Sequence, residues 1–343
     1  MTDISLTGLG WSNTFRAQLT EDDTGSPARI SAVARDRVTA LTPEGPLGLV
    51  PGGMSTGEIA VGDWVLTDGA RVLRVLERQT LIQRRAAGER AARQLIAANV
   101  DTLGIVTSCN ADFNVARLER YLALAAASGC LPLVILTKAD LASDPRDYAR
   151  RAERLSPLVS AIALDARDPG AAELLQPWCR AGQTLALVGS SGVGKTTLTN
   201  TLTGRHDATR GIREDDARGR HTTTARALLP MVSGGWLIDT PGMRELGLTE
   251  AAEGIGEVFS DIAALAAACR FSDCAHETEP GCAVTAAIAA GELDPERLKR
   301  WRKLLREDAR STETIAEARA RGKAFARHVA AVTKDHRRRK GDV

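Results

Sequence analysis

Aromatic residues are scarce in this chain, and no apolar run is long enough to cross a bilayer. Phe, Trp and Tyr make up 3% of the 343 residues, whereas apolar residues make up 43%. A sizeable core must therefore rest on aliphatic side chains. The longest apolar runs, such as 131–136, fall well short of the roughly 20 residues of a membrane helix. Residues 1–10 lack the basic segment and apolar stretch of a secretory signal, so we expect a cytoplasmic protein without membrane contacts.

Cysteine is also sparse, and half of it is clustered. Because cytosolic thiols stay reduced, the six cysteines predict core residues or metal ligands rather than disulfides. Cys109, Cys130 and Cys179 lie beside apolar segments and are expected in the core. Three thiolates and one imidazole can form a closed tetrahedral zinc site, which is typical of a structural role. We therefore expect one Zn²⁺ per chain, held by Cys269, Cys274, His276 and Cys282.

Positive charge is concentrated at one end. The net charge is only +2, but residues 297–343 hold 16 Lys and Arg against 6 Asp and Glu. A basic tail on an acidic body suggests a polyanionic partner, whereas a solvated helix is the alternative interpretation.

The sequence predicts a multidomain α/β protein whose segments differ in their pattern of apolar, Gly and Pro residues. Short strands split by Gly and Pro indicate a small OB-like β-barrel, in which Trp64 is the main candidate for stacking on a base. Alternating apolar runs and helical patterns then predict a parallel sheet covered on both faces. The expected segments are an arm without periodic signals at 1–30, the barrel at 31–82, a basic linker at 83–93, the α/β domain at 94–249 and a helical zinc-binding domain with the basic tail at 250–343.

A phosphate-binding loop is the strongest motif. Residues 189–196 fit G-x-x-x-x-G-K-[ST] between an apolar strand and a helix, a context that favours phosphate binding over an accidental glycine-rich turn. Lys195 would contact the β- and γ-phosphates, and the Thr196 hydroxyl would bind Mg²⁺. The residues expected around the phosphates are Gly189, Ser190, Ser191, Gly192, Val193, Gly194, Lys195, Thr196 and Thr197.

Two further segments fit a nucleotide hydrolase. Asp239 ends another apolar strand in the sequence Asp-Thr-Pro-Gly, where it could hold Mg²⁺ through water, and the Gly242 N–H could meet the γ-phosphate. The polar loop 219–224 contains three threonines, one of which could complete the Mg²⁺ shell. Met243 stands where many GTPases place a water-orienting Gln, so the isolated enzyme should be slow. His221 is the best-placed substitute; a group supplied by RNA and a merely solvated histidine are the alternatives.

The segment that would read guanine precedes the phosphate loop. Thr137-Lys-Ala-Asp140 ends the apolar strand 131–136, about fifty residues before Gly189. Asp140 can accept from N1–H and N2–H₂ of guanine, and Lys138 can cover the base and steady the phosphate loop. A second strand end, at Asp165, follows where GTPases place a backbone contact to guanine O6. The order is therefore permuted relative to an ordinary GTPase.

This order resembles the ribosome small-subunit-dependent GTPase family, RsgA or YjeQ, over about residues 35–305. The resemblance implies a monomeric, circularly permuted GTPase that binds GTP, GDP, the small (30S) ribosomal subunit and its 16S rRNA. It also implies a role in late subunit maturation, with hydrolysis stimulated by the subunit. Thr137 stands where the family usually has Asn, which leaves open an NTPase with relaxed base selectivity. A nucleotide-gated RNA-binding switch with little turnover is a separate alternative. The matching segments are 61–65, 98–101, 137–140, 189–196, 219–224, 239–242 and the Cys/His cluster.

Overall fold

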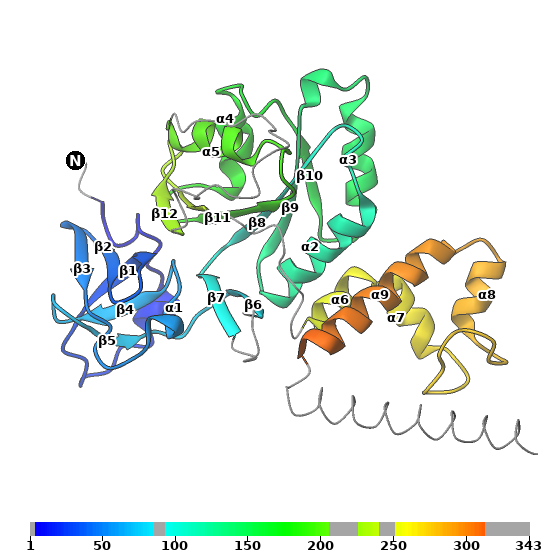
Figure 1. The fold of residues 1–343 in the computed structure, drawn as a ribbon, viewed down its shortest axis with the longest axis horizontal. Coiled ribbons are helices and arrows are strands. Elements are labelled where there is room, and N and C mark those ends of the chain that lie inside the picture. The colour runs from blue at the N-terminus through cyan, green and yellow to red at the C-terminus, as the bar shows by residue number, and fades with distance from the viewer. Residues whose placement is uncertain (1–3, 86–92, 206–225, 240–250, 313–343) are drawn as a thin grey trace, which may run out of the picture.

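The structure is a computed structural model, and it describes residues 4–85, 93–205, 226–239 and 251–312. Three regions follow one another along the chain: a strand-rich N-terminal part, a central α/β domain and a C-terminal group of helices (Figure 1). No helix among the described residues combines the length and the hydrophobicity that crossing a membrane requires.

The N-terminal strands form the predicted barrel. They pair antiparallel in the order β3-β2-β1-β4-β5, and a parallel bridge between Val50 and Arg71 joins the two ends of that series. Aliphatic side chains such as Ile30 and Val65 fill the interior, as expected for a sequence poor in aromatic residues. The strands are β1 Ser26–Val33, β2 Val38–Thr42, β3 Gly45–Leu49, β4 Trp64–Thr67 and β5 Val72–Val75, and the 3₁₀ turn η1 Thr56–Glu58 lies between β3 and β4.

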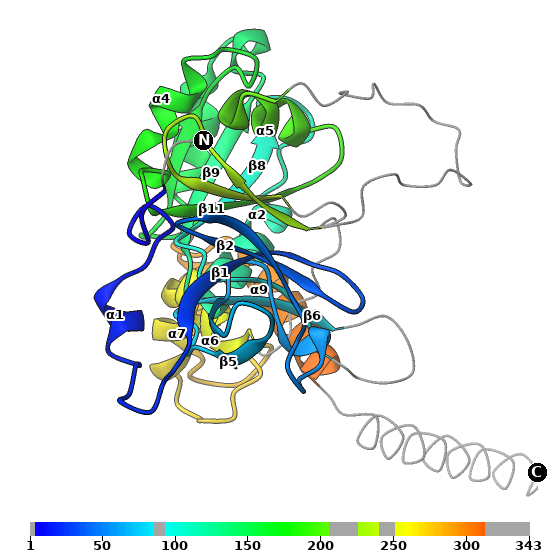
Figure 2. The ribbon, with the colours of Figure 1, turned by 90° about the vertical axis from the view of Figure 1, so that its left-hand side faces the viewer.

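The segment expected to be a loose arm is instead packed against the barrel and the α/β domain. Leu9 and Phe15 are buried, and the Trp236 indole donates a 2.7 Å hydrogen bond to the Gly8 carbonyl. The short helix α1 (Asn13–Arg16) lies at the edge of the barrel (Figure 2), and β1 already begins at Ser26. The apolar residues of this segment follow no helix or strand period, so the sequence pattern did not reveal their burial.

Trp64 is not available to stack on a base. Its side chain is 1% exposed, and its ring meets Trp11 edge-on at a centroid distance of 4.8 Å. The ring of Phe15 lies 5.8 Å from it. Trp64 therefore belongs to the core that joins the N-terminal segment to the barrel, which removes the main candidate for stacking on a base.

The basic segment 83–93 is not a simple linker. Its two ends belong to a pair of antiparallel strands, β6 (Leu81–Arg85) and β7 (Arg93–Ala98). Residues 86–92 lie outside the described residues. The charged side chains obscured two short strands whose apolar residues, such as Ile82 and Ile96, are buried.

The central domain is built on a parallel sheet, as the sequence predicted. Its strands lie in the order β10-β9-β8-β11-β13, and the antiparallel β12 joins them to β1, so one sheet runs through both domains. The strands are β8 Thr102–Ser108, β9 Leu131–Thr137, β10 Ser160–Ala163, β11 Thr184–Gly189, β12 Ala227–Pro230 and β13 Trp236–Asp239. The helices are α2 Val115–Ala127, α3 Pro145–Glu153, α4 Ala171–Leu175 and α5 Lys195–Thr203, with 3₁₀ turns η2 Ala139–Leu141 and η3 Gln176–Trp178.

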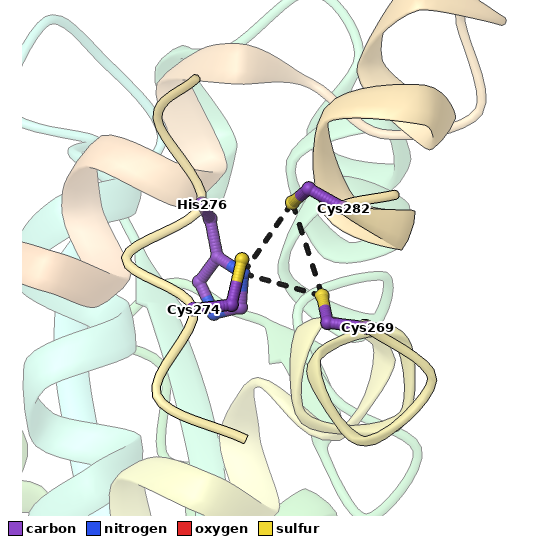
Figure 3. Close-up of side chains that lie close together, drawn as sticks. All are labelled: Cys269, Cys274, His276 and Cys282. Carbon is purple, nitrogen blue, oxygen red and sulfur yellow. Dashed lines mark hydrogen bonds between the residues drawn. The ribbon is translucent and has the colours of Figure 1, made fainter. Parts of the chain in front are cut away.

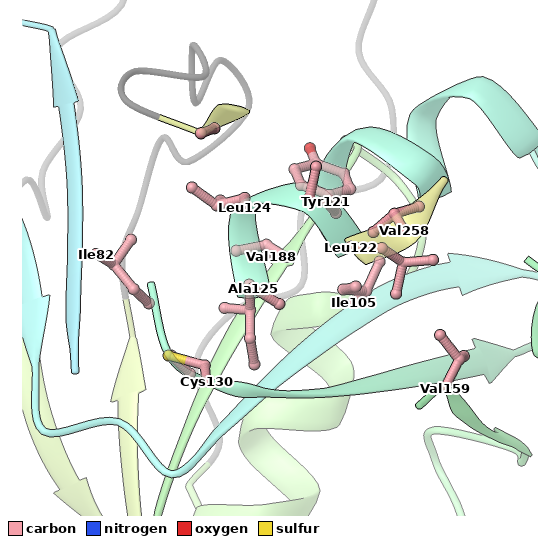
Figure 4. Close-up of a cluster of buried hydrophobic side chains, with 14 of the residues drawn as sticks. Ile82, Ile105, Tyr121, Leu122, Leu124, Ala125, Cys130, Val159, Val188 and Val258 are labelled. Atoms are coloured by element: carbon pink, nitrogen blue, oxygen red, sulfur yellow. The ribbon is translucent and has the colours of Figure 1, made fainter. Parts of the chain in front are cut away.

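Alternate side chains of these strands enter two separate cores. Ile105 packs with Leu122 of α2 in the core that Figure 4 draws, whereas its neighbour Val106 packs with Leu198 of α5 on the opposite face. Since successive strand residues point to opposite faces, a strand that is buried along its whole length, such as β8, requires cover on both sides. Cys109 and Cys130 lie in the first core and Cys179 in the second, as expected.

The C-terminal helices pack on α2. A Cβ at Gly254 would lie 2.5 Å from the Ala123 carbonyl oxygen, so this close helix contact requires glycine. Glu119 of α2 is fully buried and accepts from Arg297 (3.0 Å) and Arg300 (2.7 Å). Burial raises the pKa of Glu119, and the two guanidinium groups counteract that rise. The helices are α6 Ala252–Val258, α7 Ser260–Ala267, α8 Ala283–Ala289 and α9 Pro295–Thr312; the basic tail beyond residue 312 lies outside the described residues.

Candidate functional site

The predicted nucleotide segments meet at one edge of the central sheet. Strands β9, β11 and β13 run parallel, so their carboxyl ends share an edge. Those ends are Thr137, Gly189 and Asp239. Ligands of open α/β sheets bind at such an edge. Only β8 separates β9 from β11, which places the base-reading and phosphate-binding segments next to each other despite their reversed order in the chain.

The phosphate loop has the backbone that its motif requires. Gly189 has a φ of 143°, and a Cβ there would lie 2.1 Å from the Val106 carbonyl oxygen of β8. Only glycine therefore lets the chain turn so close to the neighbouring strand. Val193 of the loop is buried in the protein core. Helix α5 begins at Lys195, so its free N–H groups and positive dipole end lie at the loop.

Lys195 and Thr196 occupy the first turn of α5. The Lys195 ammonium donates to the carbonyl oxygen of Gly189 at 2.7 Å and to that of Ser190. The ammonium thus lies within the loop, where anionic oxygens could replace the carbonyls as its partners. Thr196 is exposed, which leaves its side chain accessible to a cation. Asp239, the other expected Mg²⁺ partner, ends the strand adjacent to β11.

Thr137 and Lys138 fasten the base-reading segment to the phosphate loop. The fully buried Thr137 hydroxyl lies 2.5 Å from the Val193 carbonyl oxygen and 3.1 Å from that of Thr107, so its single proton serves two acceptors. Lys138 has a left-handed φ of 57° and donates from Nζ to the Gly192 carbonyl oxygen at 3.0 Å. A threonine hydroxyl thus connects to the phosphate loop at the position where the family usually has an asparagine.

Asp140 belongs to a charged cluster that sequence reasoning did not foresee. Its Oδ2 accepts from Nη2 of Arg167 at 2.7 Å, and the same nitrogen donates to Asp165 Oδ2 at 3.0 Å. The hydrogen bonds from Arg167 hold the pKa of Asp165 below its usual value. The signal in the sequence was a basic residue two positions after the strand-end Asp165, which a motif search does not weigh.

Arg117 is a second contact that the motifs did not indicate. From the first turn of α2 it donates to Ser190 of the phosphate loop and, at 2.9 Å, to Asp112. The middle of the same helix carries Glu119, which holds the C-terminal helices. Helix α2 therefore contacts the phosphate loop at one end and the C-terminal region along its length.

Some predicted site residues cannot be placed. His221 and the threonines of 219–224 lie outside the described residues, as do Gly242 and Met243. The described part of the site consists of the phosphate loop, the base-reading segment and Asp239.

The four predicted zinc ligands converge. The ligand atoms of Cys269, Cys274, His276 and Cys282 all lie within 4.8 Å of one another, and the side chains point toward a common centre (Figure 3). His276 Nδ1 lies 3.5 Å from Cys269 Sγ and 3.6 Å from Cys282 Sγ, and the two sulfurs are 3.8 Å apart. Zinc bonds of about 2.0–2.3 Å in a tetrahedron give ligand separations of about 3.5–3.8 Å. The cluster therefore fits Zn²⁺.

The local structure shifts the pKa values of two thiols in this cluster. Cys282 caps α8 and accepts from the Thr285 N–H at 3.4 Å. Burial is the largest influence on this thiol and opposes its charged form, but hydrogen bonds from Thr285 and His276 help to lower its pKa to about 6. Burial raises the pKa of Cys274 to about 11. The ligands of zinc are thiolates, so zinc binding would displace the protons that remain on the sulfur atoms of the cluster.

Comparison with known proteins identifies the family. The model of the family described as RsgA GTPase matches residues 75–249. The chain belongs to the RsgA GTPase family. It is 53% identical to "Small ribosomal subunit biogenesis GTPase RsgA" of Mesorhizobium japonicum, over 90% of this chain and 91% of that protein. It is 45% identical to "Small ribosomal subunit biogenesis GTPase RsgA 2" of Vibrio parahaemolyticus, over 98% of this chain and 95% of that protein.

Solved structures agree with this assignment. YjeQ from Thermotoga maritima matches with a TM-score of 0.60 and 25% identity, over 82% of this chain and 97% of that one. YloQ, described as a circularly permuted GTPase, matches with a TM-score of 0.59 and 24% identity, over 86% of this chain and 99% of that one. The permuted order inferred from the motifs is therefore the order of a known fold, and the chain is a GTPase of the RsgA family.

Proposed function

We propose that this GTPase binds the small ribosomal subunit, hydrolyses GTP faster when bound, and acts in the late maturation of that subunit. The names of the RsgA relatives support the role in subunit biogenesis. The observation that carries the nucleotide assignment is the meeting of Thr137, the phosphate loop and Asp239 at one sheet edge. The protein would act in the cytoplasm as a monomer that contacts 16S rRNA.

Guanine selection would come from Asp140, and phosphate binding from residues 189–197. Two carboxylate oxygens suit the N1–H and N2–H₂ donors of guanine, while ATP presents no such pair at this position. Lys138 reaches the phosphate loop at Gly192, and its aliphatic stem would cover the base. Backbone N–H groups at the start of α5 would bind the β-phosphate, and Lys195 would contact the β- and γ-phosphates.

Hydrolysis would proceed by in-line attack of water on the γ-phosphate. Thr196 and, through water, Asp239 would hold Mg²⁺, which supplies charge neutralisation to the phosphates when it is bound. Lys195 would stabilise the charge that develops on the leaving oxygens. Gly242 would meet the γ-phosphate, and His221, or a group of the bound RNA, would orient the water. Because Met243 stands where many GTPases have a water-orienting glutamine, the isolated enzyme would be slow, and the bound ribosomal subunit would stimulate hydrolysis.

The Cys/His cluster would hold one Zn²⁺ in a structural role. With four protein ligands no coordination position remains for substrate. Its ring contact with Trp301 of α9, at a centroid distance of 5.8 Å from His276, supports a role in shaping the C-terminal region. That region and the basic tail would then present positive charge to rRNA.

The test is GTP hydrolysis in the presence of purified 30S, 50S or 70S particles. We expect stimulation by 30S particles, and equal rates with all three particles would contradict the proposal. Single-turnover hydrolysis would separate a GTPase from a nucleotide-gated binding switch, because a switch would bind GTP on the subunit without consuming it. Competition between GTP and ATP would detect an NTPase with relaxed base selectivity, the possibility that Thr137 raises.

A further inference from the structure

Two carboxylates and one guanidinium share the base-reading corner of the sheet. Asp140 follows β9, and Asp165 and Arg167 follow the neighbouring strand β10. Backbone hydrogen bonds hold the two loops together: Leu164 N donates to the Leu136 carbonyl oxygen at 2.9 Å, and Ala139 N to that of Leu164 at 3.3 Å. The relative position of the three charged side chains is therefore fixed by the sheet.

Arg167 is anchored on Asp165 and extends to Asp140. Its backbone N–H and its Nε donate to Asp165 Oδ1 at 3.0 and 3.1 Å. Its Nη2 donates to Oδ2 of Asp165 at 3.0 Å and to Oδ2 of Asp140 at 2.7 Å. One nitrogen thus bridges two carboxylates, which brings two negative charges close together. Without the guanidinium these charges would repel each other and turn the Asp140 carboxylate away from its present orientation.

Arg167 and a guanine base can bind Asp140 at the same time. An ionised carboxylate offers about four lone-pair positions on its two oxygens, and Arg167 occupies one of them. Guanine would need one position on each oxygen, for N1–H and for N2–H₂. The side chain of Asp140 is 29% exposed and that of Asp165 is 28% exposed. The corner is therefore open enough for a base to enter while Arg167 still bridges the two carboxylates.

We propose that Arg167 is a positioning residue for guanine recognition: it bridges Asp140 and Asp165 and holds the Asp140 carboxylate aligned for the base. This proposal rests on the assignment of Asp140 as the base reader. It makes Arg167 part of the basis of guanine preference without a direct contact to the nucleotide. It also explains how an acidic residue, Asp165, is tolerated beside the base-reading carboxylate.

The test compares Arg167→Gln with Arg167→Lys and with the double variant Asp165→Asn/Arg167→Gln. Arg167→Gln should bind GDP about 3- to 5-fold more weakly, the range of an exposed ion pair, because Arg167 is 68% exposed on its side chain. The rate of hydrolysis at saturating GTP should be unchanged. Arg167→Lys should recover part of the affinity, and the double variant most of it, because the repelling charge of Asp165 is removed. Arg150→Ala is the matched control, since Arg150 pairs with Asp144 away from this corner.

Inosine diphosphate supplies a readout that a general loss of stability would not change. It lacks the 2-amino group and needs only one oxygen of Asp140, so its affinity should fall less than that of GDP in Arg167→Gln. Unchanged or tighter GDP binding in Arg167→Gln, or a double variant as weak as the single one, would overturn the proposal. An Asp140→Asn variant that keeps its preference for GTP over xanthosine triphosphate would instead reject the base-reader assignment itself.

Discussion

The two halves of the nucleotide site are built in different ways. The phosphate half is a tightly packed backbone turn that carries the Lys195 and Thr196 side chains: a glycine pressed against Val106, a buried Val193 and the first turn of α5. The base half is made of side chains from two loops, and its main carboxylate and arginine are partly or largely exposed. In the phosphate half, Gly189 leaves no room for a larger residue, whereas the base half has a hydroxyl at Thr137 where the family usually has an amide.

Thr137 shows how this exchange works. The RsgA pattern usually has an asparagine there, yet the hydroxyl of Thr137 still reaches the Val193 carbonyl oxygen. The connection between the two halves is therefore kept while the chemical group that makes it has changed. The consequences of substitutions should follow the same division, with the largest losses in the phosphate half.

The largest effect is expected for Lys195→Ala. Loss of the ammonium removes charge stabilisation from the transferring phosphoryl group, so subunit-stimulated GTP hydrolysis should fall on the order of 100-fold or more. The measurement is phosphate release with 30S particles. Arg150→Ala removes an exposed cation of α3 that pairs with Asp144, and it should retain normal turnover. If the Lys195 variant also turned over normally, residues 189–196 would not be the phosphate site.

A smaller effect is expected at the junction of the two halves. Thr137→Val keeps the shape of the side chain but leaves the Val193 carbonyl oxygen without its hydroxyl partner. A neutral hydrogen bond contributes about 0.5–1.5 kcal/mol, so GTP should bind roughly 2- to 10-fold more weakly. Thr137→Ser retains the hydroxyl and should bind nearly as well as the native protein. Equal affinities of the Val and Ser variants in a fluorescent-nucleotide titration would show that this tie does not matter.

The smallest effect on the nucleotide is expected from loss of zinc. Replacing both Cys269 and Cys274 by Ser should abolish zinc binding, measured as about one zinc per chain in the native protein by elemental analysis. GTP affinity should change little, because the cluster lies outside both halves of the site. Glu277→Gln alters an exposed residue of the same loop and should keep its zinc. Native protein purified without any zinc would reject the metal assignment, and a large loss of GTP affinity would reject the independence of the two sites.

The sequence predicted best what depends on backbone and periodicity. A strand was expected at 131–136 and a helix directly after the phosphate loop, and the structure has β9 at Leu131–Thr137 and α5 at Lys195–Thr203. The zinc cluster was equally predictable, since four ligands within fourteen residues leave little freedom in how they can meet.

What the sequence did not predict depends on contacts between distant segments. Burial of Leu9 and Trp64 arises from packing between the N-terminal segment and the barrel, and no local pattern encodes it. The bridge from Arg167 to Asp140 requires two strands to be neighbours in space. The same holds for Glu119 and its arginines, which lie about 180 residues apart in the chain.

The most direct test of a guanine reader that precedes the phosphate loop is the nucleotide preference of Asp140→Asn. The substitution turns one acceptor into a donor, which suits the extra carbonyl of xanthine and leaves one of the two guanine donors facing another donor. Hydrolysis of GTP and of xanthosine triphosphate should be measured with 30S particles, with Asp147→Asn on α3 as the matched control. We expect the Asp140 variant to favour xanthosine triphosphate, with GTP binding weakened on the order of 10-fold or more. An Asp140→Asn variant that still prefers GTP as the native protein does would contradict the assignment.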